Sequence, residues 1–171
     1  MKFLIIFIYL ITSSFGYAIE KPNIQNLVLI KKPKSYEGVI FRDKNENDIN
    51  LADFSGKLIV LNFWATWCAP CREEMPSLDN LQSEDSLDNL MIFPINIGQE
   101  NVSKSELFFK EIGIKNLDIY FDSTITLVKK FNLRGVPTSI LFNKKGEEFA
   151  RIIGSIDFNN AELIKWLKFY N

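Results

Sequence analysis

The two cysteines of the chain, Cys68 and Cys71, are separated by two residues in the segment NFWATWCAPCREEMP, which begins at Asn62. Two thiols at this spacing can form a structural disulfide, hold part of a metal site, attach haem or exchange electrons with other thiols. Zinc needs about four ligands, and the chain has no histidine to complete the shell. Covalent haem attachment needs a histidine after the second cysteine, where this chain has Arg72. The pair therefore indicates a structural disulfide or a redox centre.

The residues on either side of the pair favour the redox centre. Lys57–Trp64, KLIVLNFW, is an apolar run of strand length, typical of a strand buried on both faces of a sheet. Pro70 suits the first turn of a helix, which places Cys68 at the helix start, where free N–H groups and the helix dipole stabilise a thiolate. We predict that Cys68 attacks substrate with a pKa of about 7 rather than about 4, and that Cys71 resolves the mixed disulfide. A structural disulfide across so short a loop recovers little chain entropy.

Length, charge and composition limit the remaining functions. A chain of 171 residues suits one domain with a core of its own. It has 20 basic and 21 acidic residues, a net charge of -1, so no general attraction for nucleic acid or anionic membranes is expected. The absence of histidine excludes Ser-His-Asp triads, Cys-His pairs and histidine metal sites. We predict no metal, no nucleic-acid partner and no cofactor beyond the cysteine pair.

The N-terminus has the pattern of a secretory signal. Lys2 is followed by an apolar run over residues 3–11, and Gly16 and Ala18 provide the small residues that precede a cleavage site. We predict that residues 1–18 are a signal peptide; the alternative is an uncleaved anchor, although the run is shorter than the ~20 residues that span a bilayer. Outside the cytoplasm, a cysteine pair meets an oxidising environment.

The rest of the pattern predicts an α/β domain. Residues 19–35 lack a clear period and are expected to form an extended leader, and residues 36–171 the domain. Val39–Asn50 predicts a β-hairpin, after which strands and helices alternate until a closing hairpin and helix. Further helices are expected to begin with a capping box at Ser103 and with a cap at Asp122. The order of elements predicts a central mixed sheet flanked by helices.

Several motifs together resemble a known family. WCAPCREEMP, which follows the predicted central strand, and Gly135–Thr138, GVPT, resemble the thioredoxin superfamily. With LADFSGK and the turn NKKG, they more closely resemble its exported branch, the TlpA, ResA and CcmG group of thiol-disulfide reductases. The match covers Val39 to the C-terminus. The resemblance implies a thioredoxin-like fold with an N-terminal β-hairpin and a central insertion at about Leu90–Phe121.

The same resemblance assigns roles to residues near the cysteines. Pro137 is implied to be a cis-proline that faces the disulfide, although X-Pro bonds in general are cis in only about 5% of cases. A cis bond there would leave the backbone of Val136 free to pair with an extended substrate, as in strand addition. Trp67, next to Cys68, is expected at the rim of the site, where it covers the sulfur and contacts the substrate.

Two explanations remain open for Glu74. An acid in the first turn of a helix stabilises it by ~0.3 to 1 kcal/mol whatever the chemistry. Glu74 also lies three residues after Cys71, on the same helix face, and the family resemblance makes it the acid that exchanges a proton with the thiol. Asn62 favours the second explanation, because cytoplasmic thioredoxins carry an aspartate at this place and an amide cannot carry the proton.

The resemblance implies a monomer on the periplasmic side of the inner membrane, released by signal cleavage or anchored by residues 1–18. It would reduce protein disulfides, in particular to keep the cysteines of apocytochrome c reduced for haem attachment, and a membrane thiol donor would reduce it again. Three alternatives remain: a reductase for copper-site cysteines in oxidase assembly, an oxidase that installs disulfides, and a non-catalytic binding module with a thioredoxin fold.

Overall fold

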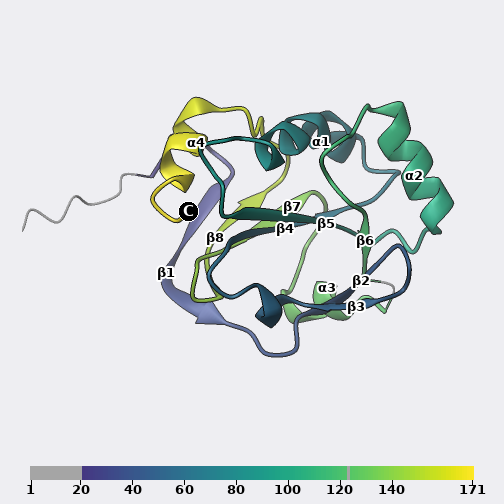
Figure 1. Cartoon of the computed structure of the whole chain (residues 1–171), viewed down its shortest axis with the longest axis horizontal. Coiled ribbons are helices and arrows are strands. Elements are labelled where there is room, and N and C mark those ends of the chain that lie inside the picture. The colour runs from purple at the N-terminus through teal and green to yellow at the C-terminus, as the bar shows by residue number, and fades with distance from the viewer. Residues whose placement is uncertain (1–20, 123) are drawn as a thin grey trace, which may run out of the picture.

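The computed structural model describes residues 21–122 and 124–171 (Figure 1). The expected signal peptide, residues 1–18, lies outside the described residues. The elements follow one another as β1 (Leu27–Ser35), β2 (Ile40–Asp43), β3 (Asp48–Asn50), η1 (Leu51–Phe54), β4 (Leu58–Trp64), α1 (Ala69–Gln82), β5 (Leu90–Asn96), α2 (Val102–Glu111), β6 (Tyr120–Phe121), α3 (Thr126–Lys130), β7 (Thr138–Phe142), β8 (Glu147–Ile153) and α4 (Ala161–Leu167).

The strands form one mixed sheet in the order β1-β8-β7-β4-β5-β6-β2-β3. Its central strand, β4, is buried along its whole length, runs parallel to β5 and is antiparallel to β7. In this register Asn62 lies opposite Pro94 on one side and Ser139 on the other. The buried, apolar strand predicted from KLIVLNFW is thus confirmed as the centre of the sheet.

The two faces of β4 pack against different helices. Successive side chains of a strand point to opposite faces, and Leu58, Val60 and Trp64 share a core with residues of α1, α2 and α4. The alternate side chains of β4 share a second core with residues of α3 and β2. Figure 1 shows the same arrangement, with α1, α2 and α4 above the sheet and α3 below it. Cys71 belongs to the first core, so the α1 face of β4 is the face that carries the chemistry.

The N-terminal segment contributes to the sheet on both edges. The expected hairpin is present as β2 and β3, and β2 also pairs with β6 of the central insertion. β1, which lies within the segment expected as an extended leader, pairs with β8. The sheet therefore takes in residues on the N-terminal side of the expected boundary at residue 36. No helix within residues 21–122 and 124–171 is both long and apolar enough to cross a bilayer.

Two predicted helix starts have different outcomes. The carboxylate of Asp122 accepts from the backbone N–H groups of the first turn of α3, at 2.8 to 3.1 Å, so its capping role is confirmed. The capping box at Ser103 was wrong, because α2 begins two residues earlier, where the side chain of Asn101 accepts from Lys104 N at 2.9 Å. Asparagine and serine are about equally good caps, and the sequence pattern alone did not separate them.

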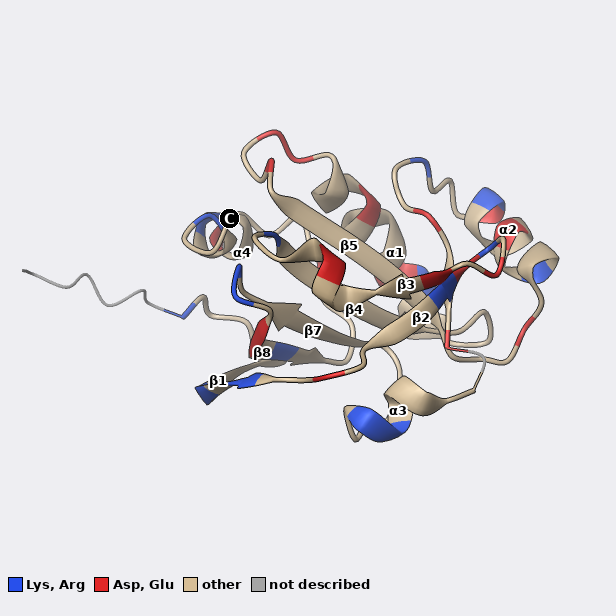
Figure 2. Cartoon of the chain, turned by 60° about the horizontal axis from the view of Figure 1, so that its bottom comes forward, with Lys and Arg blue, Asp and Glu red and all other residues tan. Residues whose placement is uncertain are grey.

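Charged residues of both signs are spread over many elements, with basic residues on α3 (Figure 2).

One buried ion pair ties β8 to its surroundings. Glu148 is buried and accepts hydrogen bonds from Arg151 and from the hydroxyl of Tyr36, the latter at 2.6 Å. Arg151 also donates to the carbonyl of Phe131 at 2.7 Å. This network joins β8 to the residue that follows β1 and to the end of α3.

We expect Glu148→Gln to lower the free energy of unfolding by about 3 kcal/mol, because it leaves the largely buried guanidinium of Arg151 without its counter-charge. Urea unfolding followed by far-UV circular dichroism measures this. The neighbouring Glu147, whose carboxylate accepts from Asn143, provides the control, and Glu147→Gln should cost less than about 1 kcal/mol. Equal losses for the two variants would contradict a special role for the buried pair.

Candidate active site

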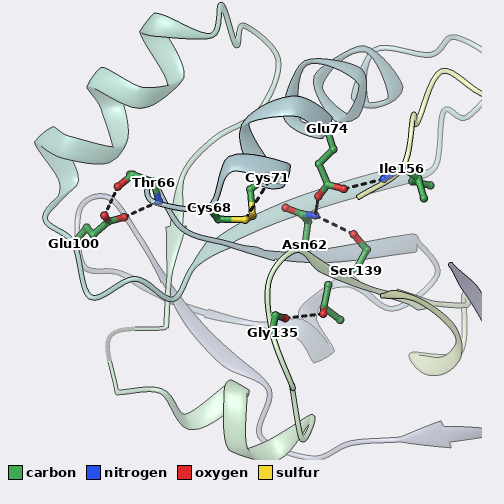
Figure 3. Close-up of a disulfide and its surroundings, with 10 residues drawn as sticks. Asn62, Thr66, Cys68, Cys71, Glu74, Glu100, Gly135, Ser139 and Ile156 are labelled. Carbon is green, nitrogen blue, oxygen red and sulfur yellow. Dashed lines mark hydrogen bonds between the residues drawn. A yellow bond between two sulfur atoms is a disulfide. The ribbon is translucent and has the colours of Figure 1, made fainter. Parts of the chain in front are cut away.

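Cys68 and Cys71 form a disulfide at the start of α1, with their Cα atoms 5.3 Å apart (Figure 3). Cys68 is the N-cap residue of the helix, and Pro70 stands in its first turn. The sulfur of Cys68 accepts from the backbone N–H of Cys71 at 3.2 Å. The predicted position of Cys68 at the helix start is therefore confirmed, and one of the free N–H groups of the first turn already points at its sulfur.

The two cysteine residues differ slightly in their access to solvent. Cys71 is completely buried, whereas Cys68 is 4% exposed. A partner must therefore approach the disulfide from the side of Cys68. Trp67 is 67% exposed, so it provides at most part of the cover that was expected over the sulfur. An indole ring in this position, next to Cys68, is available to a protein substrate.

The Gly135–Thr138 turn lies beside the carboxyl end of β4. Thr138, the first residue of β7, pairs with Phe63, and its hydroxyl donates to the carbonyl of Gly135 at 2.8 Å (Figure 3). The Val136–Pro137 peptide bond is cis, as the resemblance implied. The carbonyl of Pro137 accepts from Gly154. Within the described residues, the backbone of Val136 takes part in no hydrogen bond, which leaves it available for an extended substrate.

Glu74 lies on the same face of α1 as Cys71, in a buried polar group with residues of β4 and β7. Its side chain is 2% exposed. One carboxylate oxygen accepts from Asn62 Nδ2 at 2.8 Å, and the other accepts from the backbone N–H of Ile156 at 3.3 Å. Asn62 Nδ2 also donates to Ser139 Oγ at 2.9 Å (Figure 3). Burial raises the pKa of Glu74 from 4.5 to about 7, against these two hydrogen bonds, which lower it.

The position of Glu74 weakens the helix-dipole explanation. α1 begins at Ala69 and has no acidic residue in its first turn, and the dipole effect falls off beyond that turn. Glu73, in contrast, is exposed. A cleft of about 510 Å³ lies between α1 and residues 155–159, and Glu74 is among its lining residues. A buried carboxyl with a pKa near neutrality and a route to water is suited to proton exchange.

Glu100 belongs to a second, partly buried polar group that the sequence analysis did not identify. Its carboxylate accepts from the backbone N–H of Thr66 at 3.0 Å and also from the Thr66 hydroxyl. It also accepts from Asn96 Nδ2 at 3.0 Å and from Lys104 Nζ at 2.7 Å. Burial acts to raise the pKa of Glu100, but the hydrogen bonds from Lys104, Thr66 and Asn96 outweigh it and lower the pKa to about 2. The carboxylate is therefore ionised at neutral pH.

This carboxylate fastens the central insertion to the loop that leads into the cysteines (Figure 3). The approach is close, because a Cβ atom added at Gly98 would lie 2.9 Å from a Glu100 oxygen and 3.1 Å from the Ala65 Cβ. Thr66 directly precedes Trp67 and Cys68. Glu100 thus fixes the backbone immediately before the exposed indole of Trp67 and before Cys68.

We expect Glu100→Gln to lower kcat/KM for a protein disulfide about tenfold, mainly through a higher KM. The amide keeps the shape but loses the charge that strengthens four hydrogen bonds, and about 1.4 kcal/mol corresponds to a factor of ten. Steady-state reduction of a protein substrate measures the change. Glu106→Gln is the matched control, because Glu106 is an exposed residue of α2, the helix that follows Glu100 in the chain. Equal kinetics for the two variants would mean that the hydrogen bonds of the Glu100 carboxylate do not affect substrate reduction.

No group of three or more histidine, cysteine, aspartate or glutamate side chains in the part of the chain that the structure describes is arranged to hold a metal ion.

Comparisons with known proteins agree with this geometry. A model of the AhpC/TSA family matches residues 33–147. The thiol-disulfide oxidoreductase ResA of Bacillus subtilis is 26% identical over 143 residues, which cover 84% of this chain and 79% of that protein. The crystal structure of StoA from Bacillus subtilis matches with a TM-score of 0.62 and 25% identity, over 85% of this chain and 98% of StoA. A DsbF homologue from Corynebacterium diphtheriae matches with a TM-score of 0.69 and 23% identity, over 88% of this chain and 96% of the other. The expected thioredoxin-like fold and the resemblance to this group of proteins are confirmed.

Proposed function

We propose a function for this chain from its membership of the AhpC/TSA family and from its thiol-disulfide oxidoreductase activity. The proposal is that the protein is exported and works as a monomer that reduces protein disulfides. Its proposed client is apocytochrome c, whose cysteines must stay reduced until haem is attached. The observation that supports reduction, rather than oxidation, of the substrate is the position of the disulfide at the start of α1 with no charged residue between its cysteines. Cys68 caps α1 and no charged residue stands between the cysteines. In the reduced protein we therefore expect the helix terminus to stabilise the Cys68 thiolate only moderately.

The proposed reaction is a thiol-disulfide exchange in two steps. The Cys68 thiolate attacks one sulfur of the substrate disulfide, forms a mixed disulfide and releases the other substrate sulfur as a thiolate. Cys71 then loses its proton and attacks Cys68, which forms the Cys68–Cys71 disulfide and releases the second substrate thiolate. Two electrons pass to the substrate in this cycle. A membrane dithiol donor returns two electrons and two protons to the enzyme.

Three further residues have proposed roles in this cycle. Glu74 takes up the Cys71 proton during resolution, which its pKa of about 7 and its place on the Cys71 face of α1 support. The backbone of Val136 pairs with an extended substrate beside Cys68, with Pro137 holding the turn. Trp67 contacts the substrate through its exposed ring.

The redox potential tests the proposed direction. Equilibration of the purified protein with glutathione should give a potential of about -270 mV, as in reducing members of the superfamily, and a value of about -120 mV would identify an oxidase. An insulin-reduction assay gives a second test. A non-catalytic binding module would leave insulin intact.

The client is tested with peptides that carry an internal disulfide. One peptide has the haem-attachment sequence C-x-x-C-H, a second has the histidine replaced by alanine, and a third has the cysteine spacing of a copper site. We expect reduction of the first to be at least about tenfold faster in kcat/KM, which corresponds to about 1.4 kcal/mol. Preference for the copper-site peptide would instead favour a role in oxidase assembly.

A further inference from the structure

Asn62 stands in the middle of the buried face that carries the chemistry. It belongs to β4, is completely buried, and lies on the α1 side of the strand, because it follows Val60 by two residues. Its amide nitrogen uses both hydrogens, one toward Glu74 and one toward Ser139. The amide plane is therefore fixed from two sides.

The other atom of this amide lacks a partner. Asn62 Oδ1 is one of three buried side-chain polar atoms without a hydrogen bond among the described residues, and the other two are indole nitrogens. An amide oxygen can accept two hydrogen bonds, and a buried polar atom that makes none costs roughly 1 to 3 kcal/mol. An atom of this kind in the centre of a redox site calls for a donor that another state of the site provides.

Cys71 is the group that can provide this donor. Glu74 and Cys71 are one turn apart on the same face of α1, a spacing at which side chains are neighbours. Because Asn62 Nδ2 is directed at Glu74, the oxygen on the opposite side of the amide is directed toward the Cys71 turn. Figure 3 shows this order, with Oδ1 drawn on the side of Cys71 and Nδ2 on the side of Glu74 and Ser139. Cys71 and Asn62 are both completely buried.

We propose that Asn62 Oδ1 accepts the S–H proton of Cys71 in the reduced protein. In the disulfide, the sulfur of Cys71 carries no hydrogen, so the acceptor stays empty. When a dithiol donor reduces the pair, it gives up two electrons and two protons and becomes a disulfide, while Cys68 and Cys71 become thiols. The new S–H of Cys71 is a buried donor beside an unoccupied acceptor.

The consequence is that Asn62 shifts the equilibrium of the pair toward the dithiol. The oxidised form bears the unpaired oxygen and the reduced form does not. The inference needs only that the cysteine pair is reversibly reduced, so it stands apart from the proposed direction, client and export.

The equilibrium test uses Asn62→Leu, which fills a similar volume without an acceptor. The test is done at a fixed glutathione ratio and pH 8, where Glu74 is ionised. In Asn62→Leu the ratio of dithiol to disulfide should fall about fivefold, which corresponds to the free energy of one modest hydrogen bond. Asn62→Val, which suits a strand, serves if the leucine variant does not fold. Ser139→Ala is the matched control, since it removes one of the Asn62 bonds but leaves Oδ1 in place. It should leave the ratio within about twofold.

A spectroscopic test observes the bond itself. In Cys68→Ser, Cys71 is the single thiol of the chain, and its S–H stretching band is measured by infrared spectroscopy at pH 8. We expect a narrow band at lower frequency in Cys68→Ser and in Cys68→Ser with Ser139→Ala. The band should move to higher frequency when Asn62→Leu or Asn62→Val is added. The same band with and without the Asn62 substitution would overturn the proposal, whatever the glutathione equilibrium shows.

Discussion

Cys68→Ser should abolish turnover of protein disulfides, with a rate at least about a thousandfold below that of the unchanged protein, since loss of a nucleophile commonly costs this much or more. Cys71→Ser should behave differently. Its Cys68 remains able to attack, but the second sulfur that would release the substrate is missing, so the reaction stops at the mixed disulfide. The asymmetry follows from the structure, in which Cys68 keeps a small exposure of 4% and Cys71 is completely buried.

The insulin-reduction assay measures turnover in both variants, and intact-mass spectrometry detects the trapped adduct. Ser77→Ala is a suitable control, because Ser77 is a buried polar residue of α1 whose hydroxyl bonds to Glu74 O and to the backbone N–H of Phe158. It should retain turnover and form no stable adduct. An adduct on Cys68→Ser in place of Cys71→Ser would reverse the assigned roles.

Glu74→Gln should slow disulfide reduction about a hundredfold at pH 7, the lower range of general acid–base effects. An amide cannot accept the proton that Cys71 loses during resolution. The unchanged protein should show a rate that rises with pH through the Glu74 pKa of about 7, and the variant should lack this rise. Glu73→Gln, one residue away on the exposed side of α1, should match the unchanged protein. Equal rates and pH profiles for both variants would return Glu74 to a purely structural role.

The same substitution has a consequence for stability. The folded pKa of Glu74 lies above its ordinary value of 4.5, so the folded state holds a proton that the unfolded chain has lost between about pH 4.5 and pH 7. The stability contributed by this proton is complete below pH 4.5 and is lost as the pH rises through 7. The raised pKa corresponds to about 3 kcal/mol. Urea unfolding of the oxidised protein from pH 4 to pH 8 should show this decline, and Glu74→Gln should remove it.

Local features of the sequence predicted the centre of the site. The apolar run of β4, Pro70 and the cysteine spacing are short-range signals, so the strand, the helix start and the place of Cys68 at that start followed from them. The place of Glu74 on the helix face of Cys71 followed from its three-residue offset from Cys71. The cis bond at Pro137 needed the family resemblance, because isolated X-Pro bonds favour trans.

Contacts between distant segments escaped the sequence analysis. Glu100 is 34 residues from Thr66, and nothing in the residues around it distinguishes it from a solvent-exposed acid. A glycine two residues earlier was the only local sign of a close approach. β1 was missed as a strand because its residues after Leu29 are mostly lysine and proline, a composition that protects an edge strand from aggregation and hides its period.

The pairing of β1 with β8 sets the length of the connection to the N-terminus. β1 begins at Leu27, so eight residues, 19 to 26, separate it from the end of the expected signal segment. Fully extended, eight residues reach about 28 Å. A form that kept residues 1–18 in the bilayer would hold the domain close to the membrane and would serve clients at the membrane surface. A cleaved form would diffuse freely.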